Sequence, residues 1–209
     1  KVTFESNPDY DMIAKTKFGI TFGSENRLFL AGNKDYKNID RYNVSNDLLG
    51  DNIKSQSYEL TYFPSKNYRP VGGNGAINGY VIATDNQLYI TKENHVGDNK
   101  LFIRERILDE NGIVGYREHK TNISKTPLNN RTIVRFFNDI LMLTVDGLYA
   151  IEISSNVLTN ERLIKLRSSF VNKDLVNKIK AYDKDKIFIA ENNQYMYMFI
   201  GNTVYVIDS

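Results

Sequence analysis

The feature that most constrains the fold is a short hairpin pattern that recurs along the chain. It reads "NGYVIATDNQLYITKEN" at residues 78–94, and it returns as "NDILMLTVDGLYAIEI" and "NQYMYMFIGNTVYVID". Each copy has a mostly apolar segment that ends at a turn-forming pair, and these pairs are Asp85-Asn86, Asp146-Gly147 and Gly201-Asn202. Such pairs accept positive φ and favour two-residue hairpin turns. Tyr and Phe, which favour strands, are also plentiful, at 14 and 11 residues, so we expect an all-β fold.

The hairpins recur at a nearly constant spacing. A tyrosine follows each turn at the same place, at Tyr89, Tyr149 and Tyr205, which are 60 and then 56 residues apart. An earlier, looser copy is "NRLFLAGNKDYKNIDRYNVS", with strands expected at 27–31 and 40–44. The period of roughly 58 residues is somewhat above the ~40–50 residues of small propeller blades.

Each unit has room for three or four strands. Between residues 93 and 138, for example, lie the strand-like segments "NKLFIRERIL", "GIVGYREHK" and "RTIVRFF". Small antiparallel units that cannot bury their apolar faces alone are typical of propellers. We therefore predict one β-propeller-like domain over 1–209, alone or as part of a larger propeller. Its four repeat units are expected at about 18–60, 71–125, 131–160 and 181–209. The alternative is a β-sandwich in which similar hairpins recur by chance.

One segment departs from the strand pattern. In "NERLIKLRSSFVNKDLVNKIKAY" the apolar residues fall near helical spacing. We predict a helical insertion at 161–180, with its helical turns around 174–180, because two serines interrupt any longer helix.

Charge and cysteine content narrow the classes of partner. The chain has 27 basic and 25 acidic residues, a net charge of +2 and no cysteine. No large field of one sign is expected, and no apolar run approaches the ~20 residues of a membrane span, so we predict neither nucleic-acid specificity nor a membrane partner. The sequence begins "KVTFESNPDY" without an initiator Met, and we expect a fragment of a longer protein.

The residues offer no catalytic or metal-binding constellation. The run "VGGNGAING" at 71–79 is glycine-rich, but a strand rather than a helix follows it, so we interpret it as a connecting loop. Asp183, Asp185 and Glu191 lack the spacing of a calcium-binding loop, and His95 and His119 lack further ligands. We predict no catalytic, cofactor-binding or metal-binding residues, and no enzymatic activity.

A cluster of aromatic residues is the candidate interaction site. The stretch "SYELTYFPSKNYRPVGG" combines rings with an arginine, a combination typical of protein interfaces, and the loop at 33–40 adds one more ring. The candidate interface residues are Tyr36, Tyr58, Tyr62, Phe63, Tyr68 and Arg69. The alternative is that these rings pack back over a sheet edge.

Longer stretches of the chain resemble structural proteins of tailed-bacteriophage virions. The resemblance lies in "ENRLFLAGNKDYKNIDRYNVS", in "YFPSKNYRPVGGNGAINGYVIATDNQLYITKEN" and in "RSSFVN" followed by "DKDKIFIAENNQYMYMFIGNTVYVID". It spans roughly residues 26–208. The sequence departs from the pattern at Tyr42-Asn43, where Trp is common, and this weakens the match of the first unit.

The resemblance implies a non-enzymatic tail component of the nozzle, hub or tube-end type. Such a protein self-associates, in a ring for example, and contacts neighbouring virion proteins. Its location would be the virion, after assembly in the cytoplasm of the bacterial host. Two other functions stay open: a module that binds a host glycan or receptor through tyrosine rings, and a propeller glycosidase or lyase. The second would need convergent carboxylates, and the sequence has no cluster of that kind.

Overall fold

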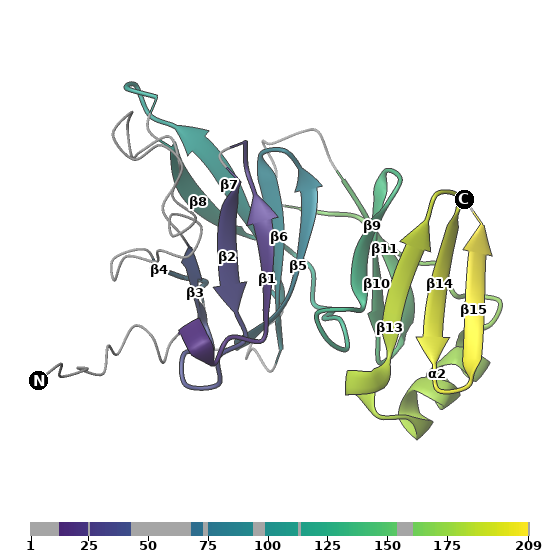
Figure 1. Cartoon of the computed structure of the whole chain (residues 1–209). Helices are drawn as coiled ribbons and strands as arrows, with labels where there is room; N and C mark the ends of the chain where they lie inside the picture. The colour runs from purple at the N-terminus through teal and green to yellow at the C-terminus, as the bar shows by residue number, and fades with distance from the viewer. Residues whose placement is uncertain are drawn as a thin grey trace, which may run out of the picture.

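The computed structural model describes residues 13–24, 26–42, 68–72, 75–93, 99–112, 114–153 and 161–208, with only the backbone given for 41–42 and 68–70. These residues form four small antiparallel sheets and a helix of ten residues (Figure 1). The all-β prediction is therefore confirmed. Within the described part of the chain, no helix is long and apolar enough to cross a membrane.

Each sheet consists of strands that follow one another in the sequence. The first contains β1 (Phe18–Phe22), β2 (Arg27–Ala31), β3 (Ile39–Tyr42) and β4 (Tyr68–Pro70). The second contains β5 (Ala76–Thr84), β6 (Gln87–Glu93), β7 (Leu101–Leu108) and β8 (Val114–Lys120). The third contains β9 (Ile133–Phe136), β10 (Asp139–Thr144), β11 (Gly147–Glu152) and β12 (Ile164–Leu166). The fourth contains β13 (Phe188–Asn192), β14 (Tyr195–Ile200) and β15 (Thr203–Asp208).

The sheets stand next to one another in chain order. The first strand of each sheet contacts the first strand of the next, β1 against β5, β5 against β9 and β9 against β13. Figure 1 shows the first two sheets on the left and the last two on the right. The helix α2 (Asn172–Ala181) and a short 3-10 helix at Lys184–Lys186 connect the third sheet to the fourth.

A separate apolar cluster joins each pair of neighbouring sheets. Phe22 and Phe29 of the first sheet pack with Leu88 and Ile90 of the second. Tyr89, between those two residues on β6, faces the other way and packs in the cluster shared with the third sheet. Successive strand residues point to opposite faces, so β6 is buried on both sides. The third and fourth sheets share another cluster, which includes Leu175 and Ile179 of α2.

The three hairpins predicted from the sequence are present, but they do not occupy equivalent places. The pair β5–β6 opens the second sheet, whereas β10–β11 and β14–β15 are the second and third strands of their sheets. Tyr89 is therefore not the counterpart of Tyr149 and Tyr205. The equivalent positions are the first strands, which begin at residues 18, 76, 133 and 188, about 55 to 58 residues apart.

Two unit boundaries also differ from those expected. β4 joins the first sheet beyond residue 60, through pairs such as Arg69 with Asp40. β12 extends the third sheet into the segment expected to be helical, and α2 begins only at residue 172. In this segment the Ser168 hydroxyl accepts a hydrogen bond from the Leu148 backbone N–H at 3.0 Å, and this contact holds the chain against β11.

Candidate functional site

The last sheet packs against the third sheet on one face, and no sheet of the described residues covers its other face. Side chains of β14 alternate, so Met196, Met198 and Ile200 pack toward the third sheet and are buried. The residues between them, with their cross-strand partners, point the other way. We call the apolar part of this second surface the outer face: Phe188, Ala190, Tyr195, Tyr197, Phe199, Val204 and Val206. The polar cross-strand partners of Tyr195, which are Asn192 and Asp208, flank it.

Aromatic rings form a ladder along the outer face. Phe188 and Phe199 stack with ring centroids 4.5 Å apart, and Tyr197 lies 6.5 Å from Phe199 and 6.4 Å from Tyr195. Tyr195 is 41 % exposed, and the valines Val204 and Val206 are 48 % and 56 % exposed. An aromatic and aliphatic surface of this kind on a rigid sheet is a typical protein contact surface.

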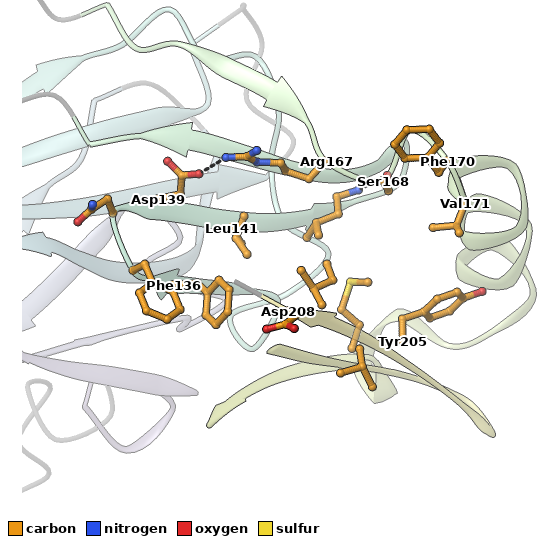
Figure 2. A pocket seen from close by; sticks show the side chains of 15 residues that line it. Phe136, Asp139, Leu141, Arg167, Ser168, Phe170, Val171, Tyr205 and Asp208 are labelled. Carbon is orange, nitrogen blue, oxygen red and sulfur yellow. Dashed lines mark hydrogen bonds and ion pairs between the residues drawn. The ribbon is translucent and has the colours of Figure 1, made fainter. Parts of the chain in front are cut away.

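A groove of about 700 Å³ separates the third and fourth sheets on the covered side (Figure 2). Its floor is apolar and includes Phe136, Leu141 and Met198, which continue the buried cluster. One wall is β15, with Tyr205 and Ile207, and the other includes the segment that leads from β12 into α2. Phe170 in that segment is fully exposed.

Polar groups lie at the margin of the groove. Arg167 donates to Asp139 across the third sheet, and Figure 2 shows this pair beside the apolar floor. The hydroxyl of Tyr205 donates to the carboxylate of Asp174 on α2. Burial, followed by this hydrogen bond, raises the pKa of Tyr205 to about 12. The tyrosine therefore stays neutral and fixes α2 against β15 at ordinary pH.

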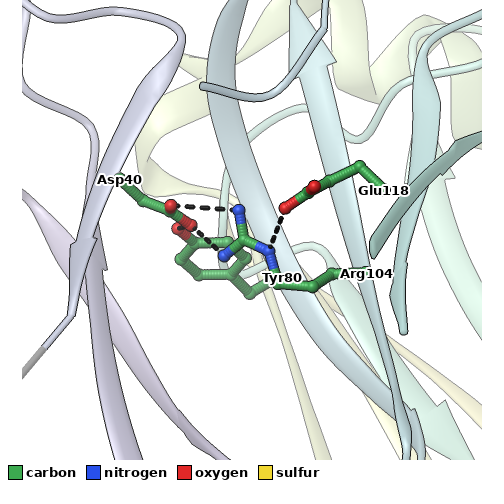
Figure 3. A network of polar contacts seen from close by, with 4 residues as sticks. All are labelled: Asp40, Tyr80, Arg104 and Glu118. Atoms are coloured by element: carbon green, nitrogen blue, oxygen red, sulfur yellow. Dashed lines mark hydrogen bonds and ion pairs between the residues drawn. The ribbon is translucent and has the colours of Figure 1, made fainter. Parts of the chain in front are cut away.

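A buried polar network joins the first and second sheets (Figure 3). Arg104 on β7 donates from Nη1 and Nη2 to the two carboxylate oxygens of Asp40 on β3, at 2.6 and 3.0 Å. Its Nε donates to Glu118 at 2.9 Å, and the Tyr80 hydroxyl donates to Asp40 at 2.6 Å. The guanidinium lies 4.9 Å from the centre of the Phe29 ring. Because the partners come from different sheets, the network fixes how the sheets dock.

The network keeps Arg104 protonated and Tyr80 neutral. Burial alone would lower the pKa of Arg104, but the charge and hydrogen bonds of Asp40 outweigh it and hold that pKa above its usual range. Burial and the neighbouring Asp40 raise the pKa of Tyr80 well above 10. All the partners are used within the network, so we assign it a structural rather than a chemical role.

A second buried cation lies nearby on β6. The ammonium of Lys92 donates to the backbone oxygens of Val71 and Gly72, at 2.7 and 2.8 Å. Its side chain is inaccessible to water, and burial lowers its pKa to about 8. Lys92 thereby holds Val71 and Gly72, which directly follow β4, against the second sheet.

The predicted interface residues lie elsewhere. Tyr36 is on the β2–β3 loop and is 37 % exposed. Tyr68 and Arg69 are in β4, where only the backbone is described, and Tyr58, Tyr62 and Phe63 lie outside the described residues. The aromatic loop therefore stays a prediction.

The sequence reasoning missed the outer face, although a signal was present. In "YMYMFI" the aromatic and the aliphatic residues alternate strictly over β14. A strand that is apolar on both sides is expected to pack against a neighbour on each side. In β14 the third sheet covers one side only.

The histidine and acidic residues that could bind a metal or act in catalysis do not lie together in the described structure. His119 on β8 is half-buried and lies 3.1 Å from Glu105, while His95 is outside the described residues. Asp183 caps the 3-10 helix by accepting from the Asp185 N–H. No group of three possible metal ligands occurs among the residues that the structure describes.

Another pocket, of about 380 Å³, lies where loops of all four sheets come together. Its polar lining residues include Lys17, Lys34, Lys37, Asn78, Glu93, Asn129, Asn130 and Asp185. Amides, ammonium groups and carboxylates thus surround one cavity near the starts of the first strands.

Comparison with known proteins gives little support for any assignment. No protein-family model matches the sequence, and no curated protein is similar to it. A solved structure described as the AfRom2 CNH domain is similar, with a TM-score of 0.45 and 10 % sequence identity. The match covers 93 % of this chain and 54 % of the other, so the chain spans about half the length of that protein.

Proposed function

We propose that this chain is a non-enzymatic structural protein of a phage tail whose sheets are consecutive blades of a propeller-like array. The resemblance to tail nozzle, hub and tube-end proteins suggests the setting. In that setting the chain assembles with copies of itself and with neighbouring tail proteins.

The arrangement of first strands supports the propeller-like interpretation. In a propeller the innermost strand of each blade lies beside that of the next, and blades pack face to face. The contacts of β1, β5, β9 and β13 and the apolar cluster between each pair of sheets follow this scheme. The four sheets form an open row in which the last one has an outer face.

The observation that carries the assembly role is that outer face. Three times within the chain, a sheet buries an apolar face against the next sheet. The outer face repeats this chemistry without a following sheet among the described residues. A sheet of a neighbouring tail subunit is therefore its expected occupant.

The first experiment asks whether the protein is part of a particle. Antibody raised against this chain is applied to purified particles of the phage that encodes it, and gold label is located by electron microscopy. We expect label at one reproducible level of the tail. Absence of label from intact, disrupted and partly assembled particles contradicts the proposal.

A second experiment tests the outer face itself. Tyr195→Ser combined with Phe199→Ser is expected to prevent incorporation into tails, because it removes two rings from the contact surface. Leu108→Ser changes an exposed apolar residue on β7 and is the control. If both variants assemble as the wild type does, the outer face is not the contact.

One observation favours a second candidate function, a module that binds a host glycan. The polar pocket between the four sheets combines amides with groups of both charges, and such groups hydrogen-bond sugar hydroxyls. A glycan array probed with the purified chain tests this candidate. The amides of Asn78 and Asn129 already donate within the fold, so the variants are Lys34→Ala and Asn130→Ala. Binding that these two variants leave unchanged would place any glycan site elsewhere.

A further inference from the structure

The fourth sheet ends in an unusual edge strand. The first three sheets have four strands each, whereas the fourth has three among the described residues, so β15 is its outer edge. The outer strands of the other sheets are β4, β8 and β12. An outer edge presents unpaired N–H and C=O groups, which is a template for pairing with another strand.

The other three edges carry features that discourage such pairing. β4 has three residues and ends in Pro70, and β12 has three residues with Lys165 at its centre. β8 is longer, but it has four ionisable residues in a row, "REHK". β15 has six residues, "TVYVID", with no Pro, Lys or Arg. It is the least protected outer edge in the described part of the chain.

The hairpin geometry fixes which groups point outward. The two-residue turn Gly201-Asn202 makes Ile200 and Thr203 the closing pair, so Thr203, Tyr205 and Ile207 bond to β14. The backbone groups of Val204 and Val206 therefore point away from the sheet. No backbone hydrogen bond to either valine from another described segment is present.

The groove can accommodate side chains of a further strand that pairs with β15. Tyr205 and Ile207 line it from β15, and side chains of a strand paired with β15 would alternate between the groove and the outer face. The groove also continues the established interface between the third and fourth sheets, through Leu141 and Met198.

We infer that β15 pairs antiparallel with β15 of a second copy of this chain about a two-fold axis. In the register that we propose, Val204 lies opposite Val206 of the other copy and Tyr205 lies opposite its own equivalent. Thr203 lies opposite Ile207. Asp208, the charged residue of the strand, falls beyond these pairs. A shift by two residues would instead place Asp208 against Val204.

A second copy is the occupant because the edge is self-complementary in this register. Every cross-strand pair is apolar or neutral, and a two-fold contact needs the same patch on both copies. The pairing makes a continuous six-stranded sheet and places Tyr205 and Ile207 of each copy toward the other's groove. It uses the edge of the sheet rather than the outer face, so it does not depend on the phage-tail assignment.

Sedimentation velocity of the purified chain over a range of concentrations tests the inference. We expect a reversible monomer–dimer equilibrium, and Val206→Pro is expected to weaken it by about tenfold or more, because proline removes an outward N–H. The β14–β15 ladder does not use that N–H, so circular dichroism should be unchanged. Val206→Thr keeps the N–H and should dimerise. A wild-type chain that stays monomeric overturns the inference, as does a folded proline variant that dimerises normally.

Cysteine cross-linking tests the register, since the chain has no cysteine of its own. Tyr205→Cys is expected to form a disulfide-linked dimer, because facing residues in such a pair have Cα atoms about 4.5 Å apart. Val206→Cys alone should not. If Val206→Cys cross-links instead, the register is wrong. If Tyr205→Cys fails to fold, a mixture of Val204→Cys and Val206→Cys chains should give the mixed dimer, and its absence counts against the inference.

Discussion

Asp40 on β3 and Arg104 on β7 form a two-point ion pair although both side chains are inaccessible to water. The strands belong to different sheets, so the pair acts where the first sheet docks on the second. Tyr80 and Glu118 occupy further hydrogen-bonding positions. A buried pair of this kind gives little net stability by itself, but breaking it leaves an uncompensated charge.

Asp40→Ala is therefore expected to lower the free energy of unfolding by about 3–5 kcal/mol, because buried Arg104 keeps its charge, loses the acceptor of Nη1 and Nη2, and retains only Glu118 at Nε. Urea unfolding followed by circular dichroism measures the change. The control is Asp35→Ala, which removes the exposed Lys15–Asp35 pair and should cost under about 1 kcal/mol. Equal losses in the two variants would contradict the role of the network.

Lys92 makes stability depend on pH. With a folded-state pKa of about 8, it releases its proton on folding between pH 8 and the ordinary lysine pKa of 10.5. In that window the unfolded state binds more protons, so the free energy of unfolding rises with pH, by at most about 1.4 kcal/mol per unit. Lys92→Met should flatten this rise. Urea unfolding of the wild type and of Lys92→Met from pH 7.5 to 10.5 measures this pH dependence. Parallel plots of the free energy of unfolding against pH would contradict the role of Lys92.

Gly147 at the start of β11 is expected to tolerate no side chain. Its φ is +131°, and a Cβ there would lie 2.1 Å from the Asn172 side-chain oxygen and 2.7 Å from the Ser168 hydroxyl. Gly147→Ala should therefore cost about 2–3 kcal/mol and loosen the start of α2. Gly112→Ala is the control, since Gly112 also has positive φ but has open space around it. Thermal unfolding compares the two, and similar losses would show that the clash is relieved.

The hydroxyl of Tyr89 has a specific partner in the segment that leads into β12. It accepts from Nε of the buried Arg162 at 2.8 Å, and the backbone of Arg162 also bonds with Asn122. Tyr89→Phe should cost about 1–3 kcal/mol, because a buried charged donor loses an acceptor. Tyr36→Phe, on an exposed loop, should change stability by under about 0.5 kcal/mol. Chemical denaturation of both variants decides the point.

The strands were predictable from the sequence wherever local turn chemistry and alternation agreed. Asp85-Asn86 and Gly201-Asn202 are the turns expected, and the flanking strands pair as predicted. The third turn is offset by one residue: Thr144 pairs with Gly147, so Val145 and Asp146 form the turn. Which hairpin opens a sheet was not predictable, because β5–β6 and β14–β15 have similar local patterns and only neighbouring sheets distinguish them.

The contacts between sheets were hidden from the sequence for a different reason. Asp40 and Arg104 are 64 residues apart, and each reads as an ordinary strand residue with solvent on one side. Only the docking of two sheets makes them a buried pair. The outer face was accessible to sequence reasoning in principle, since Tyr195, Tyr197 and Phe199 alternate with buried residues.

The row of sheets has a consequence for how the chain is made. Each of the first three sheets buries an apolar face against the sheet that follows it in the sequence. During synthesis, each sheet can therefore bury that face as soon as the next sheet has left the ribosome. Folding can thus proceed by contacts between neighbouring sheets, as in repeat proteins. The last sheet receives no cover from a following sheet among the described residues, so amide protons on its edge strand β15 should exchange faster than those of β6, which is buried on both faces.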